Sequence, residues 1–543
     1  VNQGEVEMQN REIVAAWRYH DGTKHSYQSI RTNPHYLDWE TQPIPFKIYP
    51  TLEPMALNQQ LSSTGMPALA AISAMTSNAG GDVIPNRQTL AEILFLCAGI
   101  TKRRSYPGGK MLFRAAACTG ALYHIDLYLV CGDLENLEAG VYHFSPRDFA
   151  LRRLRQGDYR GVIVRASGQE PSILKAPAIL ISASTFWRNA WKYQSRAYRH
   201  CYWDSGTILA NLLAVAAARA VPAKVVLGFV DIAVSDLLGL DTRREAALSL
   251  IALGNASGQV AGRSPAIEPL ALETLPLSKR EVDYPAMREV HEASSLDSER
   301  EVVDWRGAGE NESGKRKVEN GNEEQEGGVT DDSGKRKDER EPAARLFNLQ
   351  PFNNDQMPRD AIEEVIIRRG STREFARDEI TFAQLSTMLE RATRGIHGDC
   401  FNSEDSLNDL YLIVNAVEGL PSGAYFYQRD TGVLQLLKEG DFRREAGHLG
   451  LGQAIPADCS VNVYILADLH RVLERYGNRG YRAAQLEASI IGGKLYIGTY
   501  AQRLGASGLT FFDDDVVEFF SPHAAGKSVM FLIALGKSVK GSR

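Results

Sequence analysis

The chain has 543 residues, of which 44% are hydrophobic and 24% are charged, and its formal net charge is −6. These values are typical of globular proteins and exclude the collagen-like, wholly disordered and disulfide-scaffold classes. The mildly acidic balance gives no electrostatic reason to expect nucleic acid or an anionic membrane as a partner.

At about 150 residues per domain, the length corresponds to three or four domains or to two large ones. Six cysteines are scattered without a CxxC pair, which fits a reducing compartment better than a disulfide framework or a zinc site. No basic-then-apolar signal opens the sequence, and the longest mostly apolar run, 208–218, falls short of the ~20 residues that a bilayer requires. We therefore expect a cytoplasmic protein without a membrane partner.

Two stretches of the chain predict the same order of helices and strands. In the first we expect helices at 11–20, 90–98 and 197–220, and strands at 122–131, 140–144, 150–154, 178–183 and 248–253. In the second we expect helices at 361–369, 382–393 and 480–504, and strands at 410–416, 460–467 and 528–535. The elements do not alternate as regular βαβ units, so the pattern favours an α+β fold over a doubly wound one.

A segment of different composition lies between the two stretches. From Glu310 to Glu341 more than half of the side chains are charged, which leaves too little apolar area to offset the entropy of ordering. Acids outnumber bases there by 11 to 7, which favours a solvated tether over a nuclear-localisation or nucleic-acid-binding segment. We predict a disordered linker over 285–345, a first domain at 1–284 with an insertion at about 33–85, and a second domain at 346–543.

The two flanking stretches share short motifs at a constant spacing, as internal repeats do. The segment 126–130, Asp-Leu-Tyr-Leu-Val, recurs as Asp-Leu-Tyr-Leu-Ile at 409–413. Lys192-Tyr193 recurs as Arg475-Tyr476, at the same distance along the chain. We call this distance the repeat offset. Because it is unchanged across several motifs, it indicates that the two stretches are diverged copies of one domain.

The second copy concentrates cations and hydroxyls at the end of its first predicted helix. Arg369, Ser371 and Arg373 alternate along one short segment. Guanidinium groups and hydroxyls commonly bind phosphates and the polar edges of cofactor rings. A basic helix end that only balances the helix dipole is the simpler alternative.

The first copy holds a run of small residues, 114–123, directly before a predicted strand. Such residues let a flat molecule approach the backbone closely, although a plain loop is equally compatible. Cys118 in this run has no identifiable general base, which favours a buried small residue over a nucleophile. Lys192 and Tyr193 could act as base and acid if the site shifted their pKa values, or could simply begin a charged helix.

Taken together, these motifs resemble a known family. Arg-x-Ser-x-Arg-x-Phe at 369–375 is similar to the opening flavin motif of the nitroreductase superfamily. The segments 114–130 and 191–199, with 23–26 and 34–39, resemble its SagB/ThcOx branch, the azoline-oxidising dehydrogenases. The resemblance implies FMN as cofactor, an α+β flavoprotein fold and a dimer with flavins at the domain interface. A tandem chain would then form an intrachain pseudodimer of two nitroreductase-like FMN domains.

The resemblance also implies that each flavin site draws on both partners, and the two copies keep complementary parts of it. In the second copy the implied ligands of the flavin are Arg369, Ser371, Arg373 and Lys537. In the first copy they are Arg114 and the loop residues Ala117, Cys118, Thr119, Gly120, Ala121 and Leu122. Lys192 and Tyr193 would face the flavin as catalytic base and proton relay.

The opposite combination of parts is degraded. The first copy has only Lys24-His25-Ser26 in place of the cationic motif and Gly254-Asn255 at the end of its last strand. The second copy has Glu404 and Asp405 in its small-residue loop, where carboxylates would require pairing or solvent. We therefore expect one FMN per chain.

The resemblance implies an FMN-dependent oxidoreductase, in which the flavin does the redox chemistry and the protein orients the substrate. A thiazoline or oxazoline ring of a peptide, oxidised to the azole, is the expected substrate class. One alternative is an NAD(P)H-dependent reductase of nitro compounds or quinones. Another is a flavin-free scaffold or binding protein.

Overall fold

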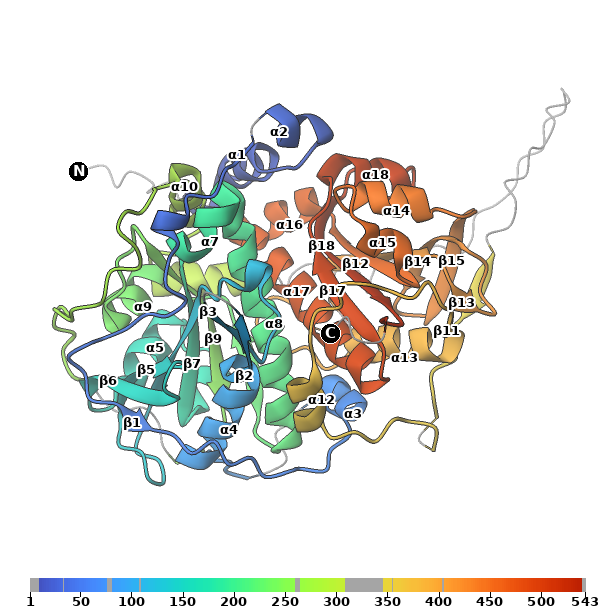
Figure 1. Ribbon diagram of the computed structural model, residues 1–543. Helices are drawn as coiled ribbons and strands as arrows, with labels where there is room; N and C mark the ends of the chain where they lie inside the picture. Colours follow the sequence, from blue (N-terminus) through green and yellow to red (C-terminus); the bar gives the residue numbers. More distant parts are fainter. Residues whose placement is uncertain are drawn as a thin grey trace, which may run out of the picture.

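The structure is a computed structural model that describes residues 9–32, 34–75, 81–106, 109–258, 264–307, 345–353, 355–402 and 405–539. Two seven-stranded antiparallel sheets, one in each half of the chain, are flanked by helices (Figure 1). This arrangement confirms the expected α+β fold. We call residues 9–258 the first half and residues 264–539 the second half.

The sheet of the first half has the strand order β1-β6-β5-β4-β7-β9-β8. Its strands are β1 (Met55–Ala56), β4 (Ile125–Cys131), β5 (Gly140–Ser145), β6 (Ala150–Gln156), β7 (Ala178–Thr185), β8 (Ala223–Val226) and β9 (Glu245–Leu253). The helices used below are α1 (Val14–Gly22), α3 (Ala68–Ser73), α4 (Arg87–Ala98), α7 (Phe186–Tyr193), α8 (Ala197–Ala218) and α9 (Asp231–Leu238). Every residue of β4 and β7 is buried, as their apolar runs predicted.

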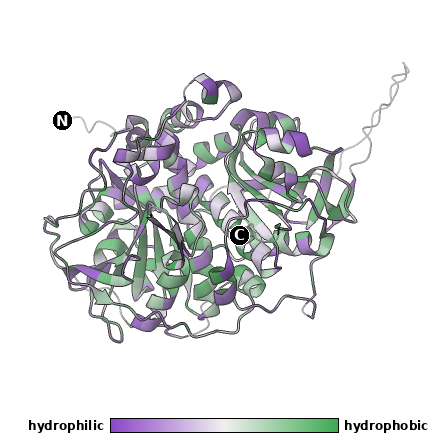
Figure 2. Ribbon diagram, in the orientation of Figure 1, coloured by the Kyte–Doolittle hydropathy of each residue, from purple (hydrophilic) through white to green (hydrophobic). Residues whose placement is uncertain are grey.

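The sheet of the second half has the order β10-β15-β14-β12-β16-β18-β17, which matches the first position by position. Its strands are β10 (Leu346–Asn348), β12 (Asn408–Val414), β14 (Gly423–Gln428), β15 (Val433–Glu439), β16 (Val461–Ala467), β17 (Gly505–Leu509) and β18 (Ser528–Gly536). Its helices include α10 (Pro285–Ala293), α12 (Ile362–Arg368), α13 (Phe382–Ala392), α16 (Leu469–Tyr476), α17 (Asn478–Ala501) and α18 (Asp513–Phe520). Figure 2 shows hydrophobic residues concentrated in the strands of both sheets.

The strand registers coincide at the spacing read from the sequence. Leu127 pairs with Ser182 in the first sheet, and Leu410 pairs with Ile465 in the second, so both members of the pair are shifted by the repeat offset. A β-bulge also interrupts the β5–β6 and β14–β15 pairings at equivalent points. The correspondence between the halves therefore includes backbone irregularities that the sequence motifs did not reveal.

The long helices α8 and α17 lie side by side between the two sheets (Figure 1). A Cβ added to Gly206 of α8 would lie 1.6 Å from Ser489 Oγ, and one added to Gly493 of α17 would lie 2.5 Å from Ala210 Cβ. Glycine at these two positions therefore lets the helix backbones approach closely. Neither these helices nor any other helix in the described ranges has the length and apolar character needed to cross a membrane.

Two equivalent clusters of buried charges join the halves. In the first cluster, Arg196 and Arg199 of the first half bind the carboxylate of Asp513 on α18, at 2.9 and 2.6 Å. Burial alone would raise the pKa of Asp513, but the two guanidinium groups outweigh it and hold the pKa well below its ordinary range. Both arginine side chains and the aspartate are almost completely buried.

The second cluster reverses the roles of the halves. Arg479 and Arg482 on α17 bind Asp231 on α9 of the first half, both at 2.6 Å. These arginines follow those of the first cluster by the repeat offset. Each pair of arginines thus binds a carboxylate that belongs to the other half.

A short helix covers each cluster and shows which segments correspond. Arg199 donates hydrogen bonds to the carbonyl of His20 at the end of α1 and to the hydroxyl of Thr23. Arg482 donates in the same way to the carbonyl of His291 in α10 and to the hydroxyl of Ser294. Helix α10 is therefore the counterpart of α1, and the second half begins before residue 285.

The expected linker over 285–345 is wrong at its N-terminal end. Residues 285–293 form α10, residues 299–307 are helical, and this stretch buries a set of apolar side chains. They are Met287, Val290, Leu296, Val302 and Trp305. Each helix contributes two of them at a spacing of three residues, and Leu296 lies in the connection between the helices. Residues 308–344, which contain that charged run, lie outside the described residues.

Residues 33–85, which we expected to be an insertion, carry β1 and α3. Strand β1 is the edge strand beside β6, as β10 is beside β15. The segments that lead into α3 and α12 pair across the halves, with the N–H of Ala68 donating to Asp360 and the N–H of Ile362 donating to Met66. The counterpart of α12 is therefore α3, and not α1 as the sequence suggested.

Asp513→Ala should lower the free energy of unfolding by about 3–5 kcal/mol, because it leaves two buried guanidinium groups without their carboxylate. Urea unfolding followed by circular dichroism measures this loss. Asp283→Ala removes an exposed ion pair with Arg288 and is the matched control, with an expected cost of at most about 1 kcal/mol. Equal costs for the two variants would contradict the structural importance of the interface cluster.

Candidate functional site

The structure brings the two complementary sets of predicted residues together at one side of the interface. Arg369 of the second half donates from Nε to the carbonyl of Ala115 at 2.9 Å and from Nη2 to the carbonyl of Arg114 at 3.2 Å. Lys102 on β2 (Ile100–Tyr106) donates to the carbonyls of Arg368 and Arg369 at 3.1 and 2.9 Å. We call this meeting point the first composite site.

The loop at 117–122 is anchored to α8 and lies against Tyr193. The N–H and hydroxyl of Thr119 donate to Oδ1 of Asp204 at 2.8 and 2.7 Å. Gly120 has a φ of 64°, and a Cβ at this position would lie 2.8 Å from the Tyr193 hydroxyl. Glycine is therefore required both by the backbone conformation and by the close approach of the tyrosine.

Lys192 and Tyr193 end helix α7 beside this loop. The Nζ atom of Lys192 lies 5.4 Å from the centre of the Tyr193 ring, and the ring of His200 packs edge-on at 4.6 Å. Burial raises the pKa of the Tyr193 phenol, and the nearby charge of Asp204 adds to the effect. The phenol is therefore a weaker acid than that of an exposed tyrosine, and its hydroxyl stays protonated beside the loop.

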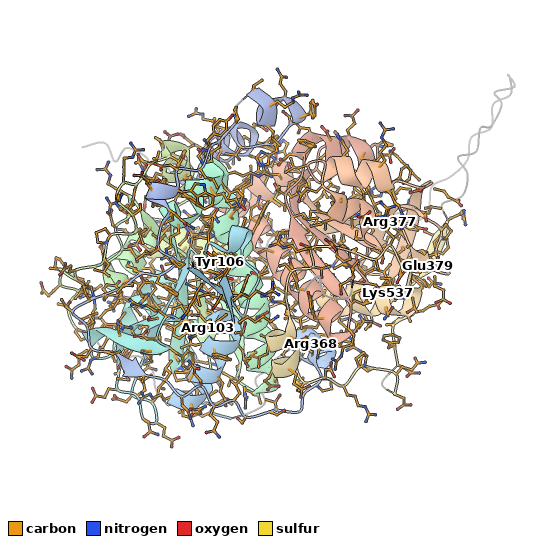
Figure 3. The ribbon with its side chains drawn as sticks, viewed as in Figure 1. Arg103, Tyr106, Arg368, Arg377, Glu379 and Lys537 are labelled. Carbon is orange, nitrogen blue, oxygen red and sulfur yellow. The ribbon has the colours of Figure 1, made fainter. Side chains whose placement is uncertain are left out.

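The other predicted residues of the second half surround the same opening. Burial raises the pKa of the Tyr496 phenol, and Ser371 is close enough to oppose the rise. The Tyr496 ring lies 5.7 Å from the Arg369 guanidinium. Arg373 is exposed, yet it is close enough to Tyr193 to oppose the rise of its pKa. Lys537 is exposed beside the same segment; Figure 3 shows it on the side of the second half, with Arg103 and Tyr106 on the first.

Arg114, which we expected to contact the cofactor, uses its side chain within the first half instead. Its guanidinium donates to the carbonyls of Pro45 at 2.7 Å and Ile125 at 3.3 Å, and lies 4.9 Å from the centre of the Tyr123 ring. Only its main-chain carbonyl, which accepts from Arg369, belongs to the composite site. Its spacing from the loop gave no information on the direction of its side chain.

Sequence reasoning missed Asp204 and Tyr496. Asp204 is a carboxylate within an otherwise mostly apolar helix, and its counterpart at the repeat offset is Glu487. Glu487 holds the equivalent loop of the second half, accepting from the Ser406 hydroxyl at 2.8 Å and the Leu407 N–H at 2.9 Å. A pair of acids at the repeat offset was therefore the available signal for Asp204.

The first composite site presents polar groups suited to a charged ligand. The end of β17 runs beside the cationic motif, where the N–H of Thr372 donates to the carbonyl of Ala506. Thr510, just beyond β17, has a buried hydroxyl oxygen without a hydrogen-bond partner among the described residues. With two exposed cations and a half-exposed loop of small residues, this arrangement fits a phosphate-bearing ring cofactor.

The equivalent place on the other side of the interface, the second composite site, is filled by the chain itself. The carboxylate of Asp399 accepts the N–H groups of Leu227 and Gly228, each at 2.8 Å. Trp305 donates from Nε1 to the carbonyl of Tyr476 at 2.9 Å, and its ring lies 3.1 Å from where a Cβ of Gly228 would be. Leu227, Trp305 and Tyr476 are at most 1% exposed.

The counterparts of Lys192 and Tyr193 are also engaged in this closed region. Arg475 binds the carboxylate of Asp405 at 2.8 Å, and the hydroxyl of Tyr476 donates to the carbonyl of Cys400 at 3.1 Å. Asp405, one of the two carboxylates that we expected to require pairing, is thus paired with Arg475. The other, Glu404, lies outside the described residues. The second composite site is closed by main-chain, carboxylate and indole groups of the protein.

The segment 24–26 is not the first half's remnant of the cationic motif, as we had expected. The N–H of His25 donates to the carboxylate of Asp513 at 2.8 Å. The position in the first half that corresponds to the cationic motif lies much further along the chain. That place follows α3, where Val83 forms a β-bridge with Asn255. In the second half, Phe375 forms the equivalent β-bridge, beyond the end of β18. The intervening residues 76–80 lie outside the described ranges.

Part of the chain is similar to known proteins. Residues 366–537 match the Nitroreductase family. The chain is 25% identical over 149 residues to a Methanocaldococcus jannaschii protein described as a nitroreductase, covering 27% of this chain and 72% of that protein. It is 30% identical over 151 residues to the microcin B17-processing protein McbC of Escherichia coli, covering 27% of this chain and about half, 52%, of McbC.

The whole fold also occurs in a solved structure. A crystal structure from Anabaena variabilis, described as a nitroreductase, matches with a TM-score of 0.72 and 24% identity. The match covers 97% of this chain and 99% of the other. A single chain with both sheets therefore exists elsewhere, and the likeness shows that the fold is shared.

Trp305→Ala should lower the free energy of unfolding by about 3–5 kcal/mol, because it removes a buried indole from the closed second site. Val303→Ala is the matched control on the same helical stretch, since Val303 is 48% exposed; it should change stability by less than about 0.5 kcal/mol. Urea unfolding compares the two variants. If Trp305→Ala left the free energy of unfolding unchanged, residues 299–307 would not contribute to the folded core.

Proposed function

We propose that the chain is an FMN-dependent oxidoreductase that binds one FMN, at the first composite site. The asymmetry between the two equivalent sites carries this proposal. The first has exposed cations, a half-exposed loop and the unpartnered Thr510 hydroxyl among the described residues. The second is filled by Asp399 and Trp305.

The residues of the first composite site divide the work of holding the cofactor. Arg373 and Lys537 would bind its phosphate, and Arg369 and Ser371 would fix the wall of the site between them. The loop at 117–122 would cover the ring system from the first half. When bound, FMN supplies a two-electron redox centre that the side chains themselves lack.

The reaction that we propose is the oxidation of a peptide thiazoline or oxazoline to the azole. Support comes from the 30% identity to McbC, a microcin B17-processing protein. Dehydrogenation of such a ring removes one hydrogen as a proton, and Lys192 is placed to accept it beside the loop. Tyr193, whose burial keeps it protonated, would donate and relay protons at the same place.

A second candidate is the reduction of a nitro compound or a quinone with NAD(P)H. It is favoured by the match of residues 366–537 to the Nitroreductase family and by the M. jannaschii relative. Such a reaction needs the same flavin site but no base that removes a carbon-bound proton. Lys192 therefore separates the two candidates.

We also infer that the two halves are copies of one domain and form a pseudodimer within one chain. The identical strand order, the shared registers and the reciprocal arginine clusters support this inference. In this arrangement every functional site at the interface draws on both copies.

Full-length protein reconstituted with FMN should contain one flavin per chain, measured by absorbance after denaturation and removal of unbound flavin. Arg373→Ala should lose most of the flavin, because it removes a charge-assisted contact with the phosphate. Arg369→Ala should also lose most of it, because it releases the wall that the guanidinium holds against the carbonyls of Arg114 and Ala115. Arg377→Ala and His25→Ala should retain it, since these residues lie outside the site. Two flavins per chain would contradict the closed second site, and a colourless protein that cannot be reconstituted would favour a flavin-free scaffold.

Lys192→Ala should reduce azoline oxidation by about 100-fold or more, as expected on loss of a general base. Reduction of a nitroaromatic or a quinone by the same variant should fall by no more than a few-fold. Arg475→Ala removes the equivalent cation of the closed site and should leave both activities unchanged. If Lys192→Ala oxidised azolines at the wild-type rate, the assignment of Lys192 as the base would be wrong.

A further inference from the structure

One buried carboxylate, that of Asp204 on α8, receives four hydrogen-bond donors from the segment that covers the first composite site. Its Oδ1 accepts the N–H and hydroxyl of Thr119 at 2.8 and 2.7 Å. Its Oδ2 lies 2.9 Å from both the thiol sulfur of Cys118 and Nε2 of His124. An ionised carboxylate has enough lone pairs to accept all four bonds. Asp204 is only 3% exposed, so these contacts are sheltered from water.

The anchoring extends to both ends of the loop. The hydroxyl of Thr207, one turn further along α8, donates to the carbonyl of Ala117 at 2.7 Å. The N–H of Tyr123 donates to the sulfur of Cys118 at 3.1 Å. Nδ1 of His124 lies 2.8 Å from the hydroxyl of Ser184 on β7, which ties the end of the loop to the sheet.

We infer that Asp204 is a positioning residue of the first composite site: it fixes residues 117–123 above the site and sets the negative charge that Cys118 and Tyr193 face. Its importance for flavin binding rests on the proposed function. Its effect on the loop, on the Cys118 thiol and on the Tyr193 phenol is independent of the proposed function, because these contacts exist in the protein without a flavin.

The charges around Cys118 and Tyr193 support this assignment. Burial raises the pKa of the Cys118 thiol, and Asp204 raises it further through its charge and hydrogen bond, whereas Arg114 opposes the rise. Burial and then Asp204 likewise raise the pKa of Tyr193, with Cys118 adding to the rise and Arg373 from the other half opposing it. Of the remaining groups that face them, Tyr123 adjoins the thiol, and Lys192 and His200 pack on the Tyr193 ring. Asp204 therefore adds to the effect of burial in disfavouring the thiolate and the phenolate beside the site.

The second half provides the matched control. Glu487 occupies the equivalent position and anchors its loop through Ser406, Leu407 and Asn408. Its donors include a hydroxyl, a main-chain N–H and a side-chain amide, but no thiol. Anchoring is thus common to both halves. Burial raises the pKa of the Cys400 thiol in the second half, and Asp399 and Glu487 add to the rise, but Cys400 is only 5% exposed, whereas Cys118 is partly exposed at the first composite site.

The test measures the rate at which iodoacetamide alkylates Cys118 across a series of pH values, in the full-length chain without added flavin. The thiolate is the reacting form, so the midpoint of the rate profile reports the pKa of Cys118. Asp204→Asn should move the midpoint to lower pH and raise the rate at pH 8 by about tenfold or more. Asp204→Glu, which keeps the charge, and Glu487→Gln, which changes the other half, should leave the midpoint near that of the wild type.

The remaining cysteines distinguish this effect from unfolding. Cys97, Cys131, Cys201, Cys400 and Cys459 are all buried and should stay unreactive in every variant, as peptide mass mapping can show. An unchanged midpoint in Asp204→Asn, or a higher plateau at an unchanged midpoint, would overturn the inference that Asp204 sets the local charge. Because no flavin is present, the inference can fail while the one-flavin proposal holds, and the reverse is equally possible.

Discussion

Each half of this chain buries two arginines whose carboxylate partner belongs to the other half. Removing ions from water costs several kcal/mol per ion unless they are paired with good geometry. Arg196 and Arg199 are paired with Asp513, and their counterparts on α17 are paired with Asp231, whose pKa the two guanidinium groups lower to about 2 against the effect of its burial. Separating the halves would expose all of these charges, so the interface is a condition of the fold. Because Arg369 contacts the opposite half's loop across this same interface, the candidate site depends on it as well.

One scaffold therefore presents two equivalent sites with opposite character. At position 116 the first half has an alanine, and at the repeat offset from it the second half has Asp399. Because an alanine stands at this position, it offers no carboxylate to the end of β17. The Thr510 hydroxyl there has no hydrogen-bond partner in the described part of the chain. The aspartate instead satisfies two main-chain N–H groups of the second site. Asp399 and Trp305 thus distinguish the second site, which holds its own polar groups, from the first, where we propose that a ligand binds.

The sequence alone was sufficient for the α+β fold and the constant offset, because long apolar runs and repeated motifs are local signals. The composite site was an expectation from the family resemblance. The sequence was insufficient where a contact joins distant residues. Residues 285–307 look like the start of a charged linker, since the apolar face ending at Trp305 is meaningful only against α17 and the first half. Asp204 looks like an isolated acid until its four donors come together, and the resemblance placed Arg114 at the site without fixing where its guanidinium points.

The asymmetry also gives a physical reason for carrying both halves in one chain. In a dimer of identical subunits every residue occurs at both sites, so a carboxylate that closes one site would close the other. The open site requires a small residue at position 116, whereas the closed one uses Asp399 at the equivalent place. These demands are incompatible within one repeated sequence but compatible within two halves that differ in sequence. The reciprocal arginine clusters are alike in both halves because the interface uses them twice, whereas the residues of the two sites differ from one half to the other.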